Sequence, residues 1–436
     1  MSLPRYPQYK EFDSEWLREI PAHWESEPCR YFVIEQTAKN ENAANQAYLS
    51  LMANVGIIPY EEKGDVGNKK PEDLSKCKLV AEGDLVINSM NYGIGSYGLS
   101  GLDGVCSPVY IVLRPRLDRA RARFAFRVFE NRAFQTHAQS FGNGILEHRA
   151  AINWDILKGI KVGVPPIEEQ DAILTFLDRE TAKIDALIAE QEKLIALLAE
   201  KRQATISHAV TKGLNPDVPM KDSGVPWLGE VPAHWEINRL KSISPQITVG
   251  IVVEPSKYYV GSGVPALRSL NVAPGRVIED NFVFISAESN DLLSKSRLRA
   301  GDLVSVRSGQ TGTTAVVPEN LNGCNCIDLI IIRKPRDDSE QFLCWFLGSD
   351  AAIQQFSSGS GGAIQQHFNI GTAMNLQIAR PPRKEQDAIV KFLEIESDKI
   401  ESLHRASEHS INLLQERRSA LIAAAVTGQI DVRGLY

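Results

Sequence analysis

Residues 165–185 read PPIEEQDAILTFLDRETAKID, and residues 381–401 read PPRKEQDAIVKFLEIESDKIE. The two stretches align without a gap and are identical at 12 of 21 positions. A proline pair suits the first turn of a helix but not its interior, and acids near the start complement the helix dipole. No Gly or Pro then occurs before Gly213 in the first copy or Gly428 in the second. The pattern predicts two helices of about 45 residues, each roughly 65 Å long.

Apolar residues recur along both predicted helices with the spacing of a coiled coil. The predicted seam residues are Leu177, Ile184, Leu187, Leu194 and Leu198 in the first helix and Leu393, Ile400, Leu403, Leu414 and Leu421 in the second. Gln191 and Ser407 interrupt this seam at the same position of each copy, as polar residues do where they fix the register. We expect the helices to pair, the alternative being that each is buried in a separate globular core.

The helices belong to a repeat of nearly the whole chain, with a period near 216 residues. The sequence WLREIPAHWE at 16–25 recurs as WLGEVPAHWE at 227–236, and GDLV at 83–86 recurs at 301–304. Between these motifs the halves diverge.

Short apolar runs bounded by turn residues predict strands in both halves. These runs lie at 85–87, 109–113, 282–285 and 329–332, and short helices are predicted at 124–134 and 350–356. The sequence therefore predicts an α+β fold with an internal pseudo-two-fold repeat. Two β-rich globular domains, 1–164 and 213–380, are each followed by a long helix, in 165–212 and in 381–436, the last including a C-terminal tail.

Composition limits the class of protein. Hydrophobic residues make up 43% of the 436 residues and charged residues 23%, as in soluble globular proteins. No apolar run reaches the ~18 residues of a membrane-spanning helix, and the first ten residues lack the apolar core of a signal peptide. Six cysteines without a paired CxxC spacing predict reduced, buried thiols and a cytoplasmic location, with no zinc site at Cys324 and Cys326.

Charge is unevenly distributed along the chain. The two helices carry −4 of the net charge of −6, so the globular parts are close to neutral. Between residues 114 and 132 there is a local surplus of +5. Its arginines are Arg114, Arg116, Arg119, Arg121, Arg123, Arg127 and Arg132. They form either a phosphate-contacting patch or a solvated helix face.

Catalytic motifs are nearly absent. Residues 93–98 spell G-x-G-x-x-G, but the following LSGLDG cannot form the helix that a dinucleotide site requires. No P-loop, H-E-x-x-H or G-x-S-x-G motif is present. A nicotinamide-dependent enzyme built on residues 93–98 is therefore only the third of three hypotheses.

The repeated W-L-x-x-[IV]-P-x-H-W-E opening, the repeated P-P-x-x-E-Q-x-A-I helix start and the two-fold plan resemble the specificity subunits of type I restriction-modification systems. The resemblance covers nearly the whole chain, and residues 368–382 also resemble the family's approach to the helix. Residues 150–154 depart from that approach, and the first opening lacks the glycine found at Gly229.

This resemblance implies two target recognition domains that each read a few base pairs of double-stranded DNA, separated by an antiparallel pair of helices. It implies two modification (methyltransferase) subunits that bind S-adenosylmethionine and methylate adenine, and restriction (helicase-nuclease) subunits that use ATP, with Mg also on the partners. It implies no catalytic residue, metal or cofactor on this chain.

The residues support the same function independently. A duplicated chain has the pseudo-two-fold symmetry needed to address two half-sites of a duplex. Divergent segments on matching frameworks would read two different half-site sequences, and the missing methyltransferase motifs require a partner for chemistry. The alternative is a stand-alone DNA-binding regulator with a coiled-coil spacer, which would bind without partners.

Direct base readout requires polar side chains on exposed loops. In the second half, the loops at 307–314 and 357–367 and the segment after Pro265 provide such residues. The candidates are Arg307, Ser308, Gln310, Thr311, Thr313, Gln365, Gln366, His367, Arg268 and Asn271. The first-half equivalents by alignment are Asn88, Asn91, Tyr92, Asn143, His148, Arg149 and Asn54. For each loop an ordinary polar surface turn is the alternative, and His23 and His234 are expected to pack in the framework.

Overall fold

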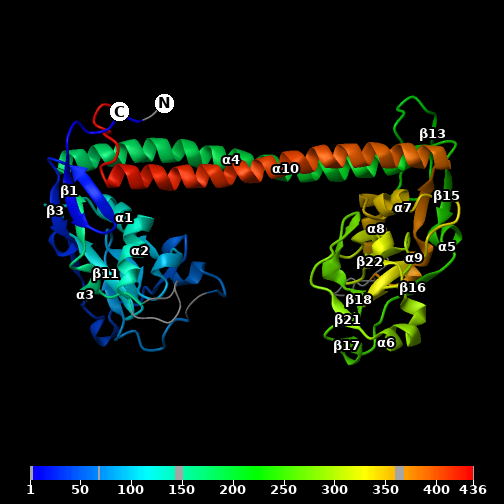
Figure 1. Cartoon of the computed structure of the whole chain (residues 1–436), viewed down its shortest axis with the longest axis horizontal. Coiled ribbons are helices and arrows are strands. Elements are labelled where there is room, and N and C mark those ends of the chain that lie inside the picture. The colour runs from blue at the N-terminus through cyan, green and yellow to red at the C-terminus, as the bar shows by residue number, and fades with distance from the viewer. Residues whose placement is uncertain (1–2, 67–68, 143–150, 359–367, 436) are drawn as a thin grey trace. The chain divides into compact units, whose positions relative to one another are not determined.

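The computed structural model describes residues 3–66, 69–142, 151–358 and 368–435 (Figure 1). The chain forms two compact units, Met1–Gln191 with His409–Tyr436, and Glu192–Glu408. Two long helices, α4 (Ile167–Lys212) and α10 (Arg383–Val426), each contribute residues to both units. Each unit thus contains one globular domain and part of each long helix.

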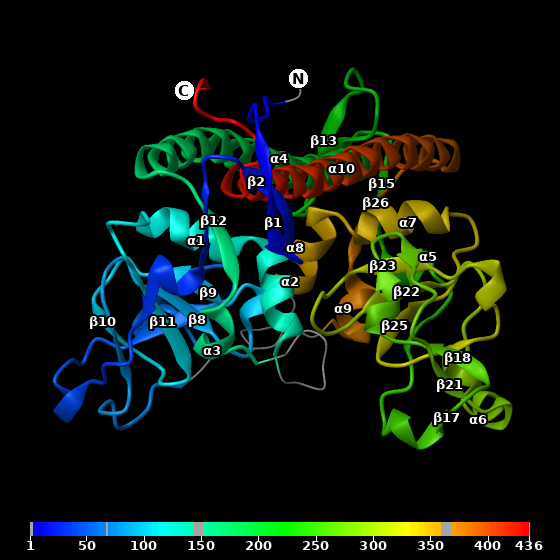
Figure 2. The same cartoon turned by 60° about the vertical axis from the view of Figure 1, so that its left-hand side comes forward.

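The first unit is built around an antiparallel sheet with the strand order β4 (Val33–Glu35), β11 (Tyr110–Pro115), β8 (Leu85–Asn88), β9 (Tyr97–Leu99). Its two-stranded pairs are β1 (Tyr9–Ser14) with β2 (Leu17–Pro21), β3 (Glu25–Pro28) with β12 (Lys161–Val164), β5 (Leu49–Met52) with β6 (Gly56–Pro59), and β7 (Lys78–Val80) with β10 (Gly104–Cys106). Its short helices are α1 (Ala122–Glu130), α2 (Arg132–Ser140) and α3 (Trp154–Leu157). Figure 2 shows α1 between this sheet and α4.

The second unit has the matching sheet β16 (Ile247–Val249), β25 (Leu329–Ile332), β22 (Leu303–Val306), β23 (Thr314–Val316), also antiparallel. A second sheet has the order β17 (Tyr259–Val260), β21 (Val283–Ile285), β18 (Val264–Leu267), β24 (Asn325–Cys326). The strand pairs are β13 (Met220–Asp222) with β14 (Glu230–Pro232), β15 (Glu236–Arg239) with β26 (Gln377–Arg380), and β19 (Val272–Ala273) with β20 (Arg276–Val277). The short helices are α5 (Leu240–Ile243), α6 (Ala287–Leu292), α7 (Glu340–Leu347), α8 (Asp350–Ser358) and α9 (Ile370–Asn375).

The two central sheets therefore share one topology. In the first sheet, β8 begins directly after the repeated Gly-Asp and is paired with β11; in the second sheet, β22 does the same and is paired with β25. The last residue pairs of these two ladders are Asn88 with Tyr110 and Val306 with Leu329. The predicted fold class, two β-rich domains each followed by a long helix, is confirmed.

One short helix differs from its prediction. Residues 124–134 were expected to form a single helix, but α1 and α2 are separated at Asn131, whose backbone is extended. The Asn131 side chain accepts hydrogen bonds from the backbone N–H groups of Ala133 and Phe134. Asparagine is a preferred N-cap for this reason, and its capping bonds start a new helix here.

The long helices begin and end as predicted. Each starts directly after its proline pair and stops at or just before a glycine. Gly213 and Gly428 have φ values of +74° and +71°. This left-handed conformation terminates helices and is strained for residues with a Cβ atom.

The predicted seam is correct at five of its ten residues and wrong by one residue at three, and the other two, Leu414 and Leu421, are half-buried. Leu177, Ile184, Leu198, Leu393 and Ile400 are buried. Leu187 and Leu403 are each 53% exposed, and Leu194 is exposed as well; the neighbouring Ile188, Ile195 and His404 are more covered instead. Two adjacent residues can each fit the heptad spacing, so the spacing alone does not decide which of them faces the other helix.

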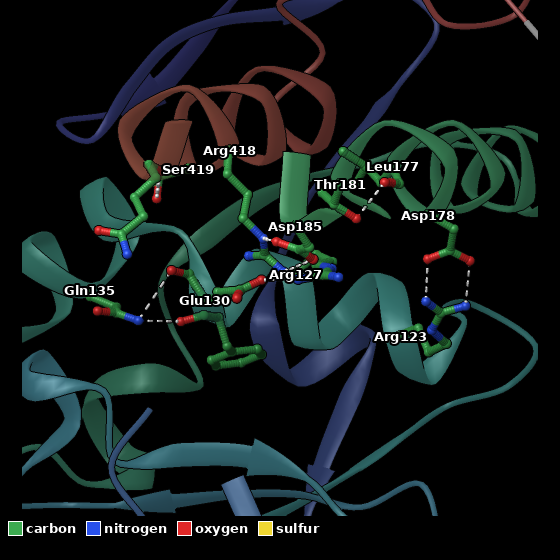
Figure 3. Close-up of polar contacts among 12 residues, drawn as sticks. Arg123, Arg127, Glu130, Gln135, Leu177, Asp178, Thr181, Asp185, Arg418 and Ser419 are labelled. Carbon is green, nitrogen blue, oxygen red and sulfur yellow. Dashed lines mark hydrogen bonds and ion pairs between the residues drawn. The ribbon is translucent and has the colours of Figure 1, made fainter. Parts of the chain in front are cut away.

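The helices are paired in each unit. In the first unit, Arg418 Nε of α10 lies 2.8 Å from Asp185 Oδ1 of α4 (Figure 3). In the second, Lys201 of α4 is close enough to Glu396 of α10 to lower the pKa of that carboxyl, although Lys399 is the larger cause. Residue numbers rise along one helix as they fall along the other, so the pair is antiparallel.

The repeated opening and the repeated helix start meet in one cluster. In the first unit, Glu169 is buried and accepts hydrogen bonds from Tyr6 Oη (2.5 Å), Trp24 Nε1 (2.9 Å) and His23 Nε2 (2.7 Å). In the second unit, Glu385 contacts His234 Nε2 at 2.9 Å. His23 and His234 are therefore framework residues, as predicted.

The glutamine after each of these glutamates fastens its domain to its helix. Gln170 accepts a hydrogen bond from Arg121 N and donates to the carbonyls of Arg119 and Pro165. Gln386 accepts from Ser339 N and donates to Asp338 Oδ1 and the carbonyl of Pro381. The E-Q pair of the helix start is thus used in the same way twice.

Candidate nucleic-acid interface

The arginine-rich segment serves mainly to attach the first domain to α4. Arg121 makes two hydrogen bonds to Asp171, at 2.8 and 2.7 Å, and Arg123 binds both carboxylate oxygens of Asp178 (Figure 3). The guanidinium groups lower the pKa of both carboxyls. Arg114 likewise pairs with the buried Asp84.

Neither alternative expected for this segment, a phosphate-contacting patch or a solvated helix face, includes these pairings with acids. Arg127 pairs with Glu130, and Arg119 lies 3.8 Å from carboxylate oxygens of Glu25 and Asp118. Among the described residues, the members of the cluster without an ion pair are therefore Arg116 and Arg132. The signal missed in the sequence was the pair of acids at Asp171 and Asp178, seven residues apart on the helix that α1 meets.

The Gly93–Gly98 segment is not a nucleotide loop. The strand β9 begins at Tyr97, within the segment, and continues to Leu99, where a dinucleotide site needs a helix. Together with the start of α2 and residues 418–423 of α10, this segment lines a cavity of 570 Å³. The first N–H groups of α2 are already satisfied by Asn131, so they are not offered to a phosphate.

Three segments converge beside the open end of each central sheet. In the first unit, the Asn54 N–H donates to the Gly95 carbonyl at 2.9 Å, and the Ile152 N–H donates to the Ser89 carbonyl at 3.0 Å. In the second unit, the Gly275 N–H donates to the Thr314 carbonyl at 2.9 Å, and the Phe368 N–H donates to the Arg307 carbonyl at 3.1 Å. The second bond of each unit is equivalent, because Ser89 and Arg307 each directly follow the last ladder residue of their strand, and it joins the loop after β8 or β22 to the residue that begins the chain's return to the framework. The first bond joins a hairpin turn to a different place in each unit: to Gly95, before β9, and to Thr314, the first residue of β23.

The loop after β22 carries five of the ten predicted second-half residues. Ser308 and Gln310 are exposed, and Thr311 and Thr313 are half-buried. Thr311 Oγ1 donates to the Arg307 carbonyl at 3.4 Å. Glycine is required here, since Gly312 has φ +87° and a Cβ atom there would lie 2.5 Å from the Phe356 ring.

The corresponding first-half loop is less polar at its surface than predicted. Asn88 is buried and its Oδ1 accepts a hydrogen bond from Met90 N at 3.1 Å. Tyr92 is fully buried and donates to the Phe129 carbonyl, so it supports the loop from inside and is not a base contact. Asn91 is half-buried, whereas Met90 and Ile94 are exposed. The prediction from polar donors does not include these two apolar residues, although apolar side chains can contact the thymine methyl group.

The third predicted segment is corrected by the structure. Asn271 is fully buried; its Oδ1 accepts from Arg268 N, and its Nδ2 donates to the carbonyls of Ile278 and Asp280. Arg268 Nη2 donates to the Asn281 carbonyl at 2.8 Å. Both residues therefore stabilise a turn. In the second unit, the hairpin turn that corresponds to the turn at the exposed Asn54 is the one at Gly275.

Several predicted base-contacting residues lie outside the described residues: Asn143, His148, Arg149, Gln365, Gln366 and His367. They stay predictions. The described parts of the chain contain no cluster of three or more potential metal ligands. All six cysteines are buried and free, and burial raises the pKa of Cys29, Cys326 and Cys344, which agrees with inert thiols.

Comparisons with known proteins agree with this plan. Residues 37–196 match the family model described as the type I restriction modification DNA specificity domain. The chain is 22% identical over 396 residues to the type I restriction enzyme MjaVIII specificity subunit of Methanocaldococcus jannaschii, which covers 87% of this chain and 88% of that protein. It is 24% identical over 454 residues to the putative type I restriction enzyme MjaX specificity subunit of the same organism, covering 98% of each.

These matches indicate a type I specificity subunit. Solved structures share the fold of this specificity subunit. One, from a study of complex assembly and conformational transition of the type I R-M system, matches with a TM-score of 0.70 at 16% identity and covers 94% of this chain and 99% of that one. The HsdS subunit from Thermoanaerobacter tengcongensis matches with a TM-score of 0.53 at 18% identity, over 94% of this chain and 98% of that one.

Proposed function

We propose that this specificity subunit reads a bipartite DNA target, one half-site per domain, and directs adenine methylation and restriction by partner subunits. It is itself a non-catalytic DNA-recognition protein. The observation that carries the proposal is an equivalent backbone bond on the loop after β8 and after β22, from Ile152 N to the Ser89 carbonyl and from Phe368 N to the Arg307 carbonyl, while the side chains on those loops differ. Such an arrangement suits two readers with one geometry and two sequence preferences.

The partners we propose are double-stranded DNA, two modification subunits and the restriction subunits. S-adenosylmethionine, ATP and Mg would be bound by these subunits, and the complex would act in the cytoplasm. Among the described residues, no helix is long and apolar enough to cross a membrane.

Exposed apolar side chains on the long helices support binding of a partner protein. On α4 they are Leu187, Leu194 and Leu197, and on α10 they are Phe392, Ile395, Leu403 and Leu413. A charged, solvated helix surface does not need large apolar residues, and groups of them mark interaction sites. We assign these positions to contacts with the modification subunits.

The decisive experiment expresses the chain with its modification subunit in cells and maps the methylated sites. The expected result is one bipartite target with an unspecified spacer. Exchanging residues 307–314 for the loop of another specificity subunit should change one half-site only. Inserting one heptad into α4 adds about 10 Å of helix, or about three base pairs, and should lengthen the spacer while both half-sites keep their bases, provided that α10 can follow. Methylation at sites without two parts, or a loop exchange that alters both halves, would refute the two-reader proposal.

A further inference from the structure

Arg307 and Asp328 form an ion pair at the open end of the second unit's central sheet. Arg307 directly follows β22 and Asp328 directly precedes β25, one step beyond the last ladder pair, Val306 and Leu329. Arg307 Nη1 lies 2.6 Å from Asp328 Oδ1, and the two side chains are 25% and 50% exposed. The pair thus lies at the surface, at the start of the loop that carries five of the candidate base-contacting residues.

Both residues are fixed through their backbones. The Arg307 carbonyl accepts a hydrogen bond from Phe368 N, and the Asp328 N–H donates to the Ile251 carbonyl at 3.0 Å. Asp328 has φ +52°, a left-handed conformation that costs free energy for residues other than glycine. The surrounding bonds hold this conformation, and it places the carboxylate against the guanidinium.

The guanidinium keeps unused donors. Its hydrogen bond to Asp328 uses only Nη1, and Nε is buried without a hydrogen-bond partner among the described residues. An arginine has five N–H donors in a rigid fork. Because Nε is buried, a base cannot reach it. The edge that carries Nη2 and the second N–H of Nη1 has no acceptor among the residues that the structure describes.

The acceptor that best fits this edge is a guanine. The O6 and N7 atoms of guanine form the two-point acceptor that arginine binds in the major groove. A phosphate has suitable acceptors too, but its attraction depends on net positive charge, which Asp328 offsets. A neutral base edge depends on geometry instead, and geometry is what Asp328 supplies.

The first unit has different chemistry at the corresponding place. There Ser89 Oγ donates to the Val109 carbonyl at 3.4 Å, just beyond the ladder pair Asn88 and Tyr110. The backbone at this place is nevertheless held alike, because the Ser89 carbonyl accepts from Ile152 N as the Arg307 carbonyl accepts from Phe368 N. A fixed backbone position with exchanged side chains is what a specificity-determining position requires.

We propose that Arg307 reads a guanine in the second half-site and that Asp328 is the positioning residue that orients its guanidinium. This inference rests on the proposed function. It predicts that the second half-site contains a guanine, on either strand, whose replacement weakens binding more in the wild type than in Arg307 variants.

The test uses the complex of the full chain with its modification subunits and duplex oligonucleotides in which each base pair of the second half-site is replaced in turn. Arg307→Lys, with Arg307→Gln as a second variant, should reduce discrimination at one guanine by ~5- to 150-fold. Asp328→Asn, in which asparagine tolerates the left-handed backbone, should reduce discrimination at the same guanine by a smaller factor. Preferences in the first half-site should stay unchanged. Preferences at the other base pairs of the second half-site should also persist, which shows that the second unit of each variant is folded.

Asp291→Asn is the matched control, because Asp291 forms an exposed ion pair with Arg297 in the same unit. It should change no preference. A second half-site without guanine would overturn the proposal, as would uniform weakening on all sequences with a shallower salt dependence, which indicates a phosphate contact. An Asp328→Asn variant with wild-type discrimination would overturn the positioning role. A wild-type complex without bipartite preference would instead refute the proposed function itself.

Discussion

Removing the Glu169 carboxylate should destabilise the first unit far more than removing Glu385 destabilises the second. Glu169 accepts hydrogen bonds from the buried Tyr6 hydroxyl and Trp24 indole and from His23. Hydrogen bonds to charged groups contribute ~1.5–3 kcal/mol each. Two buried donors without an acceptor would then cost about 3–6 kcal/mol in Glu169→Ala. Glu385 has one such partner, the exposed His234, so Glu385→Ala should cost only about 0–1 kcal/mol.

Hydrogen exchange followed by mass spectrometry measures the two units separately, which matters because unfolding of a two-unit chain is not a single two-state transition. A difference of ~2 kcal/mol in local stability corresponds to about 30-fold faster exchange. Glu169→Ala should raise exchange at 20–24 and 422–432 and leave 206–213 and 231–235 unchanged. Glu169→Gln should have a smaller effect, because its amide oxygen can still accept from Trp24. Equal loss of protection in Glu169→Ala and Glu385→Ala would refute the reasoning.

Four further outcomes are expected. The pKa values of Asp171 and Asp178 are lowered by their arginine partners, so these ion pairs stabilise the α1–α4 contact above pH ~4 and lose that contribution as the pH falls further. Hydrogen exchange in α1 should therefore rise at acid pH, and the rise should be smaller in Asp178→Asn. Gly312→Ala should unfold the loop and abolish second half-site preference, whereas Gly309→Ala, which has similar φ but open space, should only lower the melting temperature slightly. Replacing both Gln191 of α4 and Ser407 of α10, the polar residues of the predicted seam, with leucine should maintain or raise the melting temperature. A lower melting temperature would show that they are not seam positions. The purified chain alone should transfer no tritiated methyl group from S-adenosylmethionine to DNA.

The sequence predicted the parts of the fold that depend on local chemistry. Proline pairs and glycines located both ends of the long helices, and the strand at 329–332 follows from a run of apolar β-branched residues. Contacts between distant segments were not predictable in this way. The charge surplus at 114–132 suggested phosphate binding because nothing in that segment reveals that Asp171 and Asp178 lie opposite α1.

The candidate site was predictable as a loop and not as a set of side chains. The loop at 307–314 was located from its glycines and donors. Asn271 was chosen for the same polar character, yet its amide closes a turn and is fully buried. Asp328 was not chosen at all, since its role depends on a left-handed backbone and on an arginine 21 residues earlier.

The division between repeated and divergent segments has a physical cause. Where the halves repeat, side chains make the bonds that hold the fold: Glu169, Gln170 and Asp84 in the first unit, and Glu385, Gln386 and Asp302 in the second, so these residue types are required twice. Where the halves diverge, at the bases of the loops, backbone N–H and carbonyl groups make the equivalent bonds. A backbone bond is indifferent to the side chain above it. The loops can therefore exchange side chains, and with them the bases that are read, without loss of the geometry that presents them.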